Sequence, residues 1–249
     1  MSLGYDFSCT TLSQEGRIYQ LEYALKAIES ASTALGIVCK DGVILASEKI
    51  KQSKTIVSGS NPTIYHVTKT IGIGVCGHLP DGRNLVSRAK SEASSYLKNF
   101  GVEIEGRILA ERLSLYVHSH TIYWTMRPFG AVAFVSTYSK DGPHLYMIEN
   151  NGSIFEYYSA SHGKGRQYVK TDIEKNMNNF RSISCKDAVV EVLKVLVKSY
   201  EGEKETEYDI SVISEDTNFV HQILERKYIN ELTAKVKLEV DAEREERMD

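Results

Sequence analysis

The pair Ser32-Thr33 is the first place in this 249-residue sequence where hydroxyl side chains open an apolar run. A hydroxyl there would suit a hydrolase whose nucleophile uses its own N-terminal amine as the base. Such a nucleophile must become the first residue of the chain, and 31 residues precede Ser32 without a Gly-Thr processing point. A hydrolase formed by proteolytic maturation is therefore the alternative function, and a mature chain starting at Ser32 or Thr33 would establish it.

A glycine pattern at residues 72–77, Gly-Ile-Gly-Val-Cys-Gly, matches the GxGxxG signature of dinucleotide sites. In that signature the glycines form a turn and open a helix. Here Ile71, Ile73 and Val75 alternate with the glycines as in a strand, and the helical pattern starts only after Pro80. A nucleotide-binding module is a weaker alternative, which nucleotide titration would test.

The other motifs with potentially reactive side chains do not form a binding site for a metal or a cofactor. The stretch 163–166, Gly-Lys-Gly-Arg, leads into a helical pattern but lacks the spacing of a phosphate-binding loop. His118 and His120 are two residues apart on a helical pattern and so point to different sides. The cysteines are isolated from one another, at Cys9, Cys39, Cys76 and Cys185. We expect no metal, no cofactor and no disulfide framework.

The composition excludes several classes of protein. Apolar residues make up 42% of the chain and charged residues 25%, and 30 basic groups nearly balance 33 acidic ones. A disordered chain would be less apolar, and a nucleic-acid-binding protein would be more basic. No run approaches the roughly 20 apolar residues that span a bilayer. We expect a globular intracellular protein with no membrane and no nucleic-acid partner.

Hydrophobic spacing predicts the elements around these residues. Ile18, Leu21, Leu25 and Ile28 predict an amphipathic helix over 16–30, with Ser13 as its possible cap. Turn sequences predict hairpins at 39–42, 140–142 and 150–152. Apolar stripes predict two helices between the first and second hairpin groups. One stripe comprises Leu85, Ala89, Ala93, Tyr96 and Leu97, and the other Leu109, Leu113, Tyr116, Val117, His120 and Tyr123.

The order of these elements predicts the fold class. Helices near 165–178 and 185–199 precede a strand near 210–213 and a final helical stretch from about residue 217. Grouped hairpins and grouped helices favour antiparallel sheets covered by helical layers, which is an α+β fold. We expect three parts: residues 1–31 as a leading segment and helix, 32–230 as one sandwich domain, and 231–249 as an acidic extension.

Three stretches resemble the α-type subunits of the 20S proteasome. They are Tyr5-Asp6, residues 13–24 (Ser-Gln-Glu-Gly-Arg-Ile-Tyr-Gln-Leu-Glu-Tyr-Ala) leading into 32–37, and Arg127-Pro-Phe-Gly130. Residues 146–148, 163–167 and 170–175 are most similar to the eukaryotic α7-type subunit. The resemblance implies a four-layer αββα sandwich of the N-terminal-nucleophile hydrolase type.

The resemblance also implies a role. α subunits form a seven-membered outer ring that stacks on the proteolytic β ring, controls substrate entry and docks regulatory particles. The implied partners are six other α subunits, the β ring and regulatory particles, in cytoplasm and nucleus. Aligned with active β subunits, Ser32 takes the place of the nucleophile and Glu48 that of its acidic partner, whereas no lysine lies near Ile64. The chain itself is therefore expected to be non-catalytic within a threonine endopeptidase complex.

In the family, residues before the first helix form a gate over the ring axis. The positions that order this gate correspond here to Tyr5, Asp6, Gln14 and Tyr23. Gln14 replaces a proline, and Phe7 replaces the arginine of a Tyr-Asp-Arg triplet. Proline presets φ and stiffens a turn, so glutamine is expected to leave this turn looser.

A second departure concerns the family's pocket for the C-terminal tails of activators. A lysine shortly before the strand near Ile64 pairs there with the terminal carboxylate, and this chain has Thr63 instead. Gly16, on the opposite side of such a pocket, is retained. A hydroxyl donates a hydrogen bond but has no charge, so weak binding of tails is expected.

Overall fold

The computed structural model describes residues 7–200, 202 and 204–245. Ten strands form two antiparallel sheets of five strands each within this part of the chain. Sheet A has the order β10 (Gln222–Ile223), β9 (Thr206–Ser214), β2 (Gly42–Ile50), β1 (Ala34–Val38), β8 (Ser159–His162). Sheet B has the order β3 (Ile64–His66), β4 (Ile71–Gly77), β5 (Ala131–Ser139), β6 (Gly142–Ile148), β7 (Ile154–Glu156).

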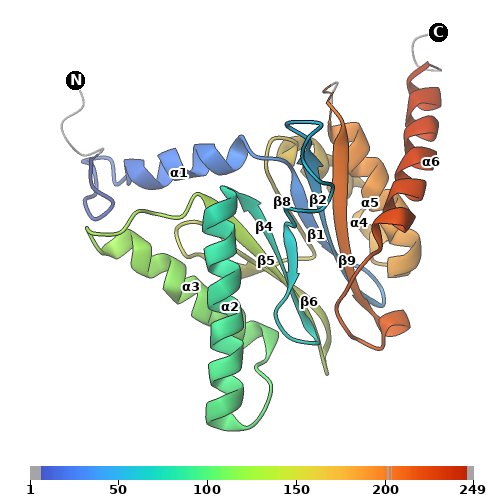
Figure 1. Cartoon of the computed structure of the whole chain (residues 1–249). Coiled ribbons are helices and arrows are strands. Elements are labelled where there is room, and N and C mark those ends of the chain that lie inside the picture. The colour runs from blue at the N-terminus through green and yellow to red at the C-terminus, as the bar shows by residue number, and fades with distance from the viewer. Residues whose placement is uncertain (1–6, 201, 203, 246–249) are drawn as a thin grey trace.

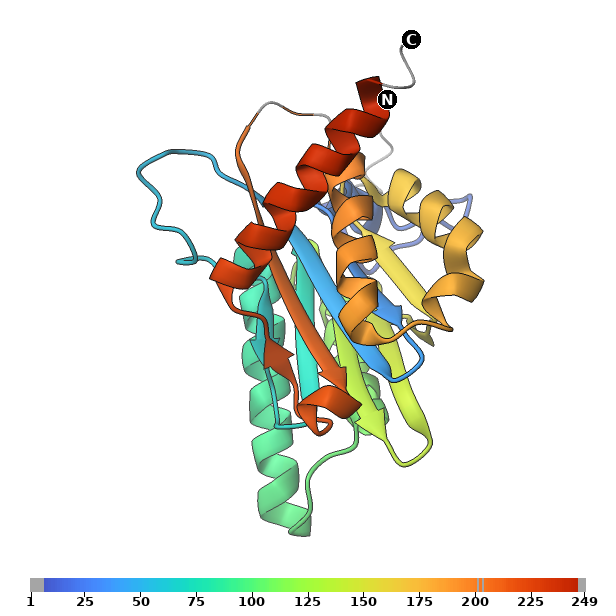
Figure 2. The same cartoon turned by 90° about the vertical axis from the view of Figure 1, so that its right-hand side faces the viewer.

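Helices cover the outer faces of both sheets (Figures 1 and 2). Helices α4 (Arg166–Phe180), α5 (Cys185–Ser199) and α6 (Arg226–Glu245) pack on sheet A. Helices α2 (Leu79–Phe100) and α3 (Gly106–Ile122) pack on sheet B. The predicted α+β sandwich is confirmed. No helix of the described residues is long and apolar enough to cross a membrane.

A third apolar cluster lies between the two sheets, where Phe134 and Leu145 of sheet B meet Leu45 of sheet A. Helix α1 (Tyr19–Glu29) lies across the end of the sandwich, and its buried Ile28 joins this inner cluster. The sequence spacing that predicts an amphipathic helix here is thus explained by one buried face. Because α1 ends at Glu29, shortly before β1, it brings the start of the first strand to the same end of the fold.

Local sequence accounts for several element ends. Ser184 caps α5 by accepting the Asp187 N–H, and Gly101 ends α2 with φ +72°, a conformation that glycine adopts without strain. Both predicted Asp-Gly turns and the predicted turn at 150–152 connect antiparallel strands: β1 to β2, β5 to β6 and β6 to β7.

Some expected features are wrong. Ser13 does not cap α1, because its hydroxyl accepts the Arg17 N–H in a turn that precedes the helix. Leu97 and Tyr123 are about half exposed rather than part of the buried stripes. The final helix does not begin near residue 217, because Asn218 and Phe219 have positive φ and β10 intervenes before α6.

The predicted boundary at residue 231 falls inside α6. Val236 and Val240 of this helix are buried against the α5 side of sheet A, so residues 231–245 continue a packed element. Two ion pairs, Lys194–Glu239 and Lys198–Glu243, link α5 to α6. The functional division of the chain into three parts stays a prediction.

Candidate functional site

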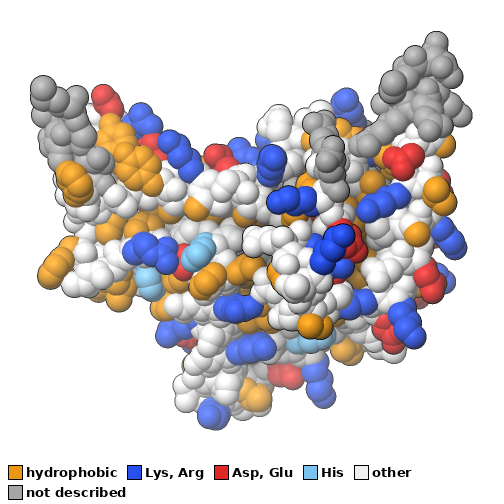
Figure 3. Space-filling model, turned by 45° about the horizontal axis from the view of Figure 1, so that its top comes forward, with side chains coloured by type: hydrophobic (Ala, Val, Ile, Leu, Met, Phe, Trp, Pro, Cys, Tyr) orange, Lys and Arg blue, Asp and Glu red, His pale blue; other side chains and the backbone are white. Residues whose placement is uncertain are grey.

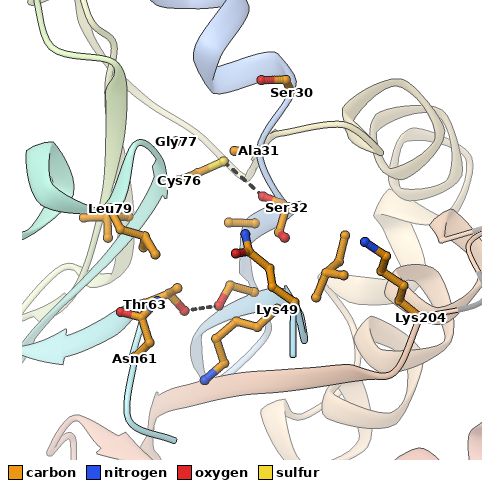
Figure 4. A pocket seen from close by; sticks show the side chains of 15 residues that line it. Ser30, Ala31, Ser32, Lys49, Asn61, Thr63, Cys76, Gly77, Leu79 and Lys204 are labelled. Carbon is orange, nitrogen blue, oxygen red and sulfur yellow. Dashed lines mark hydrogen bonds between the residues drawn. The ribbon is translucent and has the colours of Figure 1, made fainter. Parts of the chain in front are cut away.

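A hollow of about 360 Å³ opens where α1 ends and β1 begins (Figure 4). Its walls come from both sheets, from the loop before β3 and from the loop before β9. The residues that line it are Ser30, Ala31, Ser32, Ala34, Ser47, Lys49, Ile50, Gln52, Asn61, Thr63, Val75, Cys76, Gly77, Leu79 and Lys204. Of the predicted site residues, this hollow includes Ser32 and Thr63.

The nucleophile position is built into continuous backbone. Ser32 follows α1 directly, so its nitrogen is an amide and not a free amine, and its carbonyl accepts the Cys76 thiol at 3.4 Å. The Thr33 hydroxyl accepts the Gly165 N–H at 3.0 Å. These groups serve as structural hydrogen-bond partners where α1, β1 and α4 meet, and neither residue presents the amine that self-activation requires.

Glu48 lies beside this position, as the alignment predicts. Its carboxylate Oε2 accepts the Thr33 N–H at 3.5 Å, and the side chain is buried. Burial raises the pKa of Glu48, because the charged form loses its hydration, and the Thr33 hydrogen bonds offset only part of this effect. Glu48 thus ties the middle of β2 to the start of β1 through its hydrogen bond to Thr33.

The polar groups of Thr63 are hydrogen-bonded to residues of neighbouring strands. Its N–H and hydroxyl donate to Asp209 Oδ2 at 3.0 and 3.1 Å, and its hydroxyl also contacts the Ser47 hydroxyl. Asp209 receives Lys49 Nζ at 2.8 Å as well. The Thr63 hydroxyl, at the position where the resemblance predicts a lysine, is therefore buried and already bonded.

Two lysines of the hollow were missed by the sequence analysis. Lys49 follows Ser47 on the same side of β2, so strand alternation could have placed both in one site. Lys204 lies in the loop before β9 (Figure 4). No pattern in the sequence predicts that this loop reaches the hollow. Lys49 is paired with Asp209, whereas Lys204 has no ion-pair partner among the described residues.

Phe7, Gln14 and Tyr23, the predicted gate residues that the structure describes, are not among the residues that line the hollow. Tyr5 and Asp6 fall outside the described residues. Phe7 is 85% exposed, and Gln14 is exposed in the turn that leads to α1. Gly16 closes that turn with φ +75° and donates its N–H to the Ser13 carbonyl at 2.9 Å. Tyr23 is 46% exposed on α1.

Cys9 attaches the leading segment to the rest of the fold, which sequence reasoning did not anticipate. Its buried thiol lies 3.5 Å from the Met126 carbonyl and 3.7 Å from the Tyr123 carbonyl, at the end of α3. Exposed hydrophobic side chains gather at this end of the molecule, over the segment and α1 (Figure 3). The described part of the segment is therefore held by Cys9, while the side chains of Phe7 and Leu12 face outward.

The stretch Arg127–Gly130 is explained by a bidentate ion pair. Both terminal nitrogens of Arg127 donate to the Asp81 carboxylate at 2.7 Å, and the Gly130 N–H donates to the same group at 2.8 Å. Burial alone would raise the pKa of Asp81, but these hydrogen bonds outweigh it and lower the pKa. Asp81 thus joins the start of α2 to the entry of β5.

Two antiparallel sheets between helical layers, with a helix crossing one end, define a four-layer α+β sandwich of the N-terminal-nucleophile type. The family model described as "Proteasome subunit" matches residues 28–214, and the model for the N-terminal signature of A-type proteasome subunits matches residues 5–27. The chain belongs to the proteasome subunit family, carries its α-type signature and is an α subunit of the 20S core.

Curated relatives agree in type. The chain is 44% identical over 221 residues to the alpha type-3 proteasome subunit of Oryza sativa subsp. japonica, covering 88% of both chains. It is 42% identical over 245 residues to the probable alpha type-7 proteasome subunit of Schizosaccharomyces pombe, covering 98% of this chain and 96% of the relative. Residues 146–148, 163–167 and 170–175 predict this similarity to the α7-type subunit, which is confirmed.

Proposed function

We propose that this chain is a non-catalytic structural and gating subunit of the outer α ring. The observation that carries the proposal is the position of Ser32-Thr33 behind α1, where the nitrogen is an amide and the Thr33 hydroxyl holds Gly165. Its partners would be six other α subunits, the β ring and regulatory particles, in cytoplasm and nucleus. Through them it would serve ubiquitin-dependent and ubiquitin-independent protein degradation without performing hydrolysis itself.

The leading segment supports the gating part of the proposal. Its described part is attached through Cys9, turns at Ser13–Arg17 and enters α1, so Cys9 is a fixed point near its start. A segment held in this way can cover an entrance without being part of the core.

Deletion of residues 2–8 tests gating and leaves the Cys9 attachment in place. We expect faster basal hydrolysis of small peptides by the assembled particle, because the segment no longer covers the axis. The matched control is deletion of residues 246–249, which should leave hydrolysis unchanged. Equal rates for both deletions would contradict the gating role, and a mature chain starting at Ser32 or Thr33 would contradict the non-catalytic role.

Activator tails are expected to bind this chain's pocket weakly. The hydroxyl at position 63 is bonded to Asp209 and Ser47, and Lys49 is paired with Asp209. Lys204 is then the group left to attract a carboxylate in the hollow.

Crosslinking measures this expectation. A cysteine at position 63 should crosslink poorly to the C-terminal tail of an activator in the assembled particle. Lys204→Ala should weaken the residual crosslinking further, whereas Lys54→Ala, on an exposed loop, should not. Efficient crosslinking at position 63 would show that the missing lysine is not needed.

A further inference from the structure

Three polar side chains form a row across neighbouring strands of sheet B, away from the hollow at the end of α1. Ser139 ends β5, His144 lies on β6 and Glu156 ends β7. Ser139 Oγ lies 2.9 Å from His144 Nε2, and His144 Nδ1 lies 2.6 Å from Glu156 Oε1. Strand pairing brings them together: Thr137 faces His144, and Tyr146 faces Glu156.

The order of donors and acceptors in this row is that of an activated serine. Glu156 accepts the proton on Nδ1, so His144 presents the lone pair of Nε2 to the Ser139 hydroxyl. The Asp141 N–H donates to Ser139 Oγ at 3.2 Å, which leaves the hydroxyl proton free to point at the imidazole. A nucleophile, a base and a group that orients the base are thereby in sequence.

The row borders a hollow of about 840 Å³ that also receives the start of α3. Gly106 opens this 17-residue helix against Thr137, no side chain caps its N-terminus, and its first turn has no acidic residue. Figure 1 shows α3 beginning near the β5–β6 hairpin. The N–H groups of this helix start are the groups that can stabilise a developing oxyanion, since Arg107 is paired with Glu111 and acidic side chains such as Glu103 and Glu105 also line the hollow.

We propose that Ser139, His144 and Glu156 form a second reactive site, a serine acyl-transfer site for small carboxylic esters. The stacked rings of Tyr138 and Phe219, 4.2 Å apart, form an apolar wall of the same hollow. A hollow of this size, with an apolar wall and a few convergent polar groups, is typical of small-molecule sites. An ester whose acyl or alcohol part is apolar fits this combination.

The reaction needs no cofactor. Ser139 Oγ bonds to the carbonyl carbon while its proton passes to His144 Nε2, and the α3 N-terminus stabilises the oxyanion. The carbon–oxygen bond to the leaving alcohol then breaks as His144 returns the proton to that oxygen. Water attacks the acyl-Ser139 carbonyl with His144 as base, which releases the acid and restores the hydroxyl.

A fluorophosphonate probe, which phosphonylates activated serines, tests the site in the assembled particle carrying this chain. We expect a phosphonyl adduct on the peptide containing Ser139, identified by mass spectrometry. Ser139→Ala should remove it, and His144→Ala should slow its formation by about 100-fold, because general-base assistance is lost. Glu156→Gln should slow it by at least about tenfold. Ser53→Ala, at an exposed serine bonded only within its loop, is the control and should leave adduct formation unchanged.

Ester hydrolysis supplies an independent readout. p-Nitrophenyl acetate should be cleaved by the wild-type particle and more slowly by the Ser139→Ala particle, while peptide hydrolysis by the two is equal. Equal peptide hydrolysis also shows that the variant has assembled, so this result is separate from the gating proposal. Absence of an adduct at Ser139, or an adduct that forms as fast in His144→Ala, would overturn the proposal and leave the row as a structural hydrogen-bond ladder.

Discussion

Asp81 shows how much one side chain contributes at the residue scale. It is buried at the start of α2, and it neutralises Arg127 while it accepts the Gly130 N–H. Its oxygen atoms therefore satisfy two donors of a segment that lies 46 residues or more away from Asp81 in the sequence. Hydrogen bonds to charged groups are stronger than neutral ones, and an unsatisfied buried partner is costly.

Asp81→Asn is expected to lower the free energy of unfolding by about 1–3 kcal/mol, because the bidentate pair is lost and one donor of Arg127 or Gly130 loses its acceptor. Chemical denaturation of the purified chain measures this. Glu111→Gln is the matched control, since its pair with Arg107 is exposed and is worth less than about 1 kcal/mol. Equal losses in the two variants would show that the Asp81 pair has no special role.

The type of residue at a candidate site can be read from the sequence, whereas its hydrogen-bond partners are much harder to predict. The sequence shows that position 63 holds a threonine, but not that Asp209, 146 residues away, accepts a hydrogen bond from its hydroxyl. Asp209 lies on β9, and its meeting with Thr63 depends on the pairing of β9 with β2, which no local pattern specifies. The Ser139–His144 contact was easier to predict, because the predicted turn at 140–142 puts these residues on paired strands.

At the element scale, Gly72 and His221 join the two sheets. His221, just before β10 of sheet A, packs its ring on Gly72 of β4 and lies with Nδ1 2.7 Å from His66 Nδ1 of β3. A Cβ at position 72 would lie 2.3 Å from the His221 ring. Gly72, which belongs to the pattern that resembles a nucleotide signature, therefore allows the close contact between the two sheets. The apolar residues beside it alternate with the glycines, as expected in a strand.

Gly72→Ala is expected to destabilise the chain by about 1–3 kcal/mol, because the methyl group overlaps the buried His221 ring. Thermal or chemical denaturation measures the effect. Gly74→Ala is the control on the same strand, since its Cβ would meet its nearest neighbour at 3.6 Å, an ordinary contact. In combination with His221→Ala, the cost of Gly72→Ala should shrink; an unchanged cost would contradict this account.

The whole molecule combines three apolar layers, and the elements that build them were largely predictable. Periodicity located the helices because each buries one face, and turn sequences located the hairpins. The final strand and helix were misjudged because β10 has two residues, too few for a pattern, and pairs with β9 only in the folded state. The hollow at the end of α1 was beyond prediction for the same reason, since five separate segments line it.

Buried histidines should make the whole fold sensitive to acid. Burial lowers the pKa of His162 to about 4 and that of His221 to about 3, with the charges of Arg166 and His66 as smaller causes. The unfolded chain, with an ordinary histidine pKa near about 6.5, then binds more protons than the folded chain between these values. Stability is therefore complete above about pH 6.5 and falls as the pH falls below it.

Denaturation of the purified chain between pH 7.5 and 5 measures this dependence. His221→Asn should reduce the loss of stability over that range, because one of the two groups that protonate on unfolding is gone. His118→Asn changes an exposed histidine and should leave the slope as in the wild type. A wild-type slope in His221→Asn would mean that this ring is not kept neutral by burial.

The two ends of the described chain lie at opposite corners of the sandwich, with the start of α1 at one and the end of α6 at the other (Figure 1). The whole chain has a formal charge of −3, and residues 231–249, with seven acidic and four basic side chains, account for all of it. Since Val236 and Val240 hold α6 against the body, a fluorophore attached to an exposed residue of α6 would sit on a fixed helix. The particle could thus be tracked by this label, which makes α6 a reference point for distance measurements to α1 at the opposite corner.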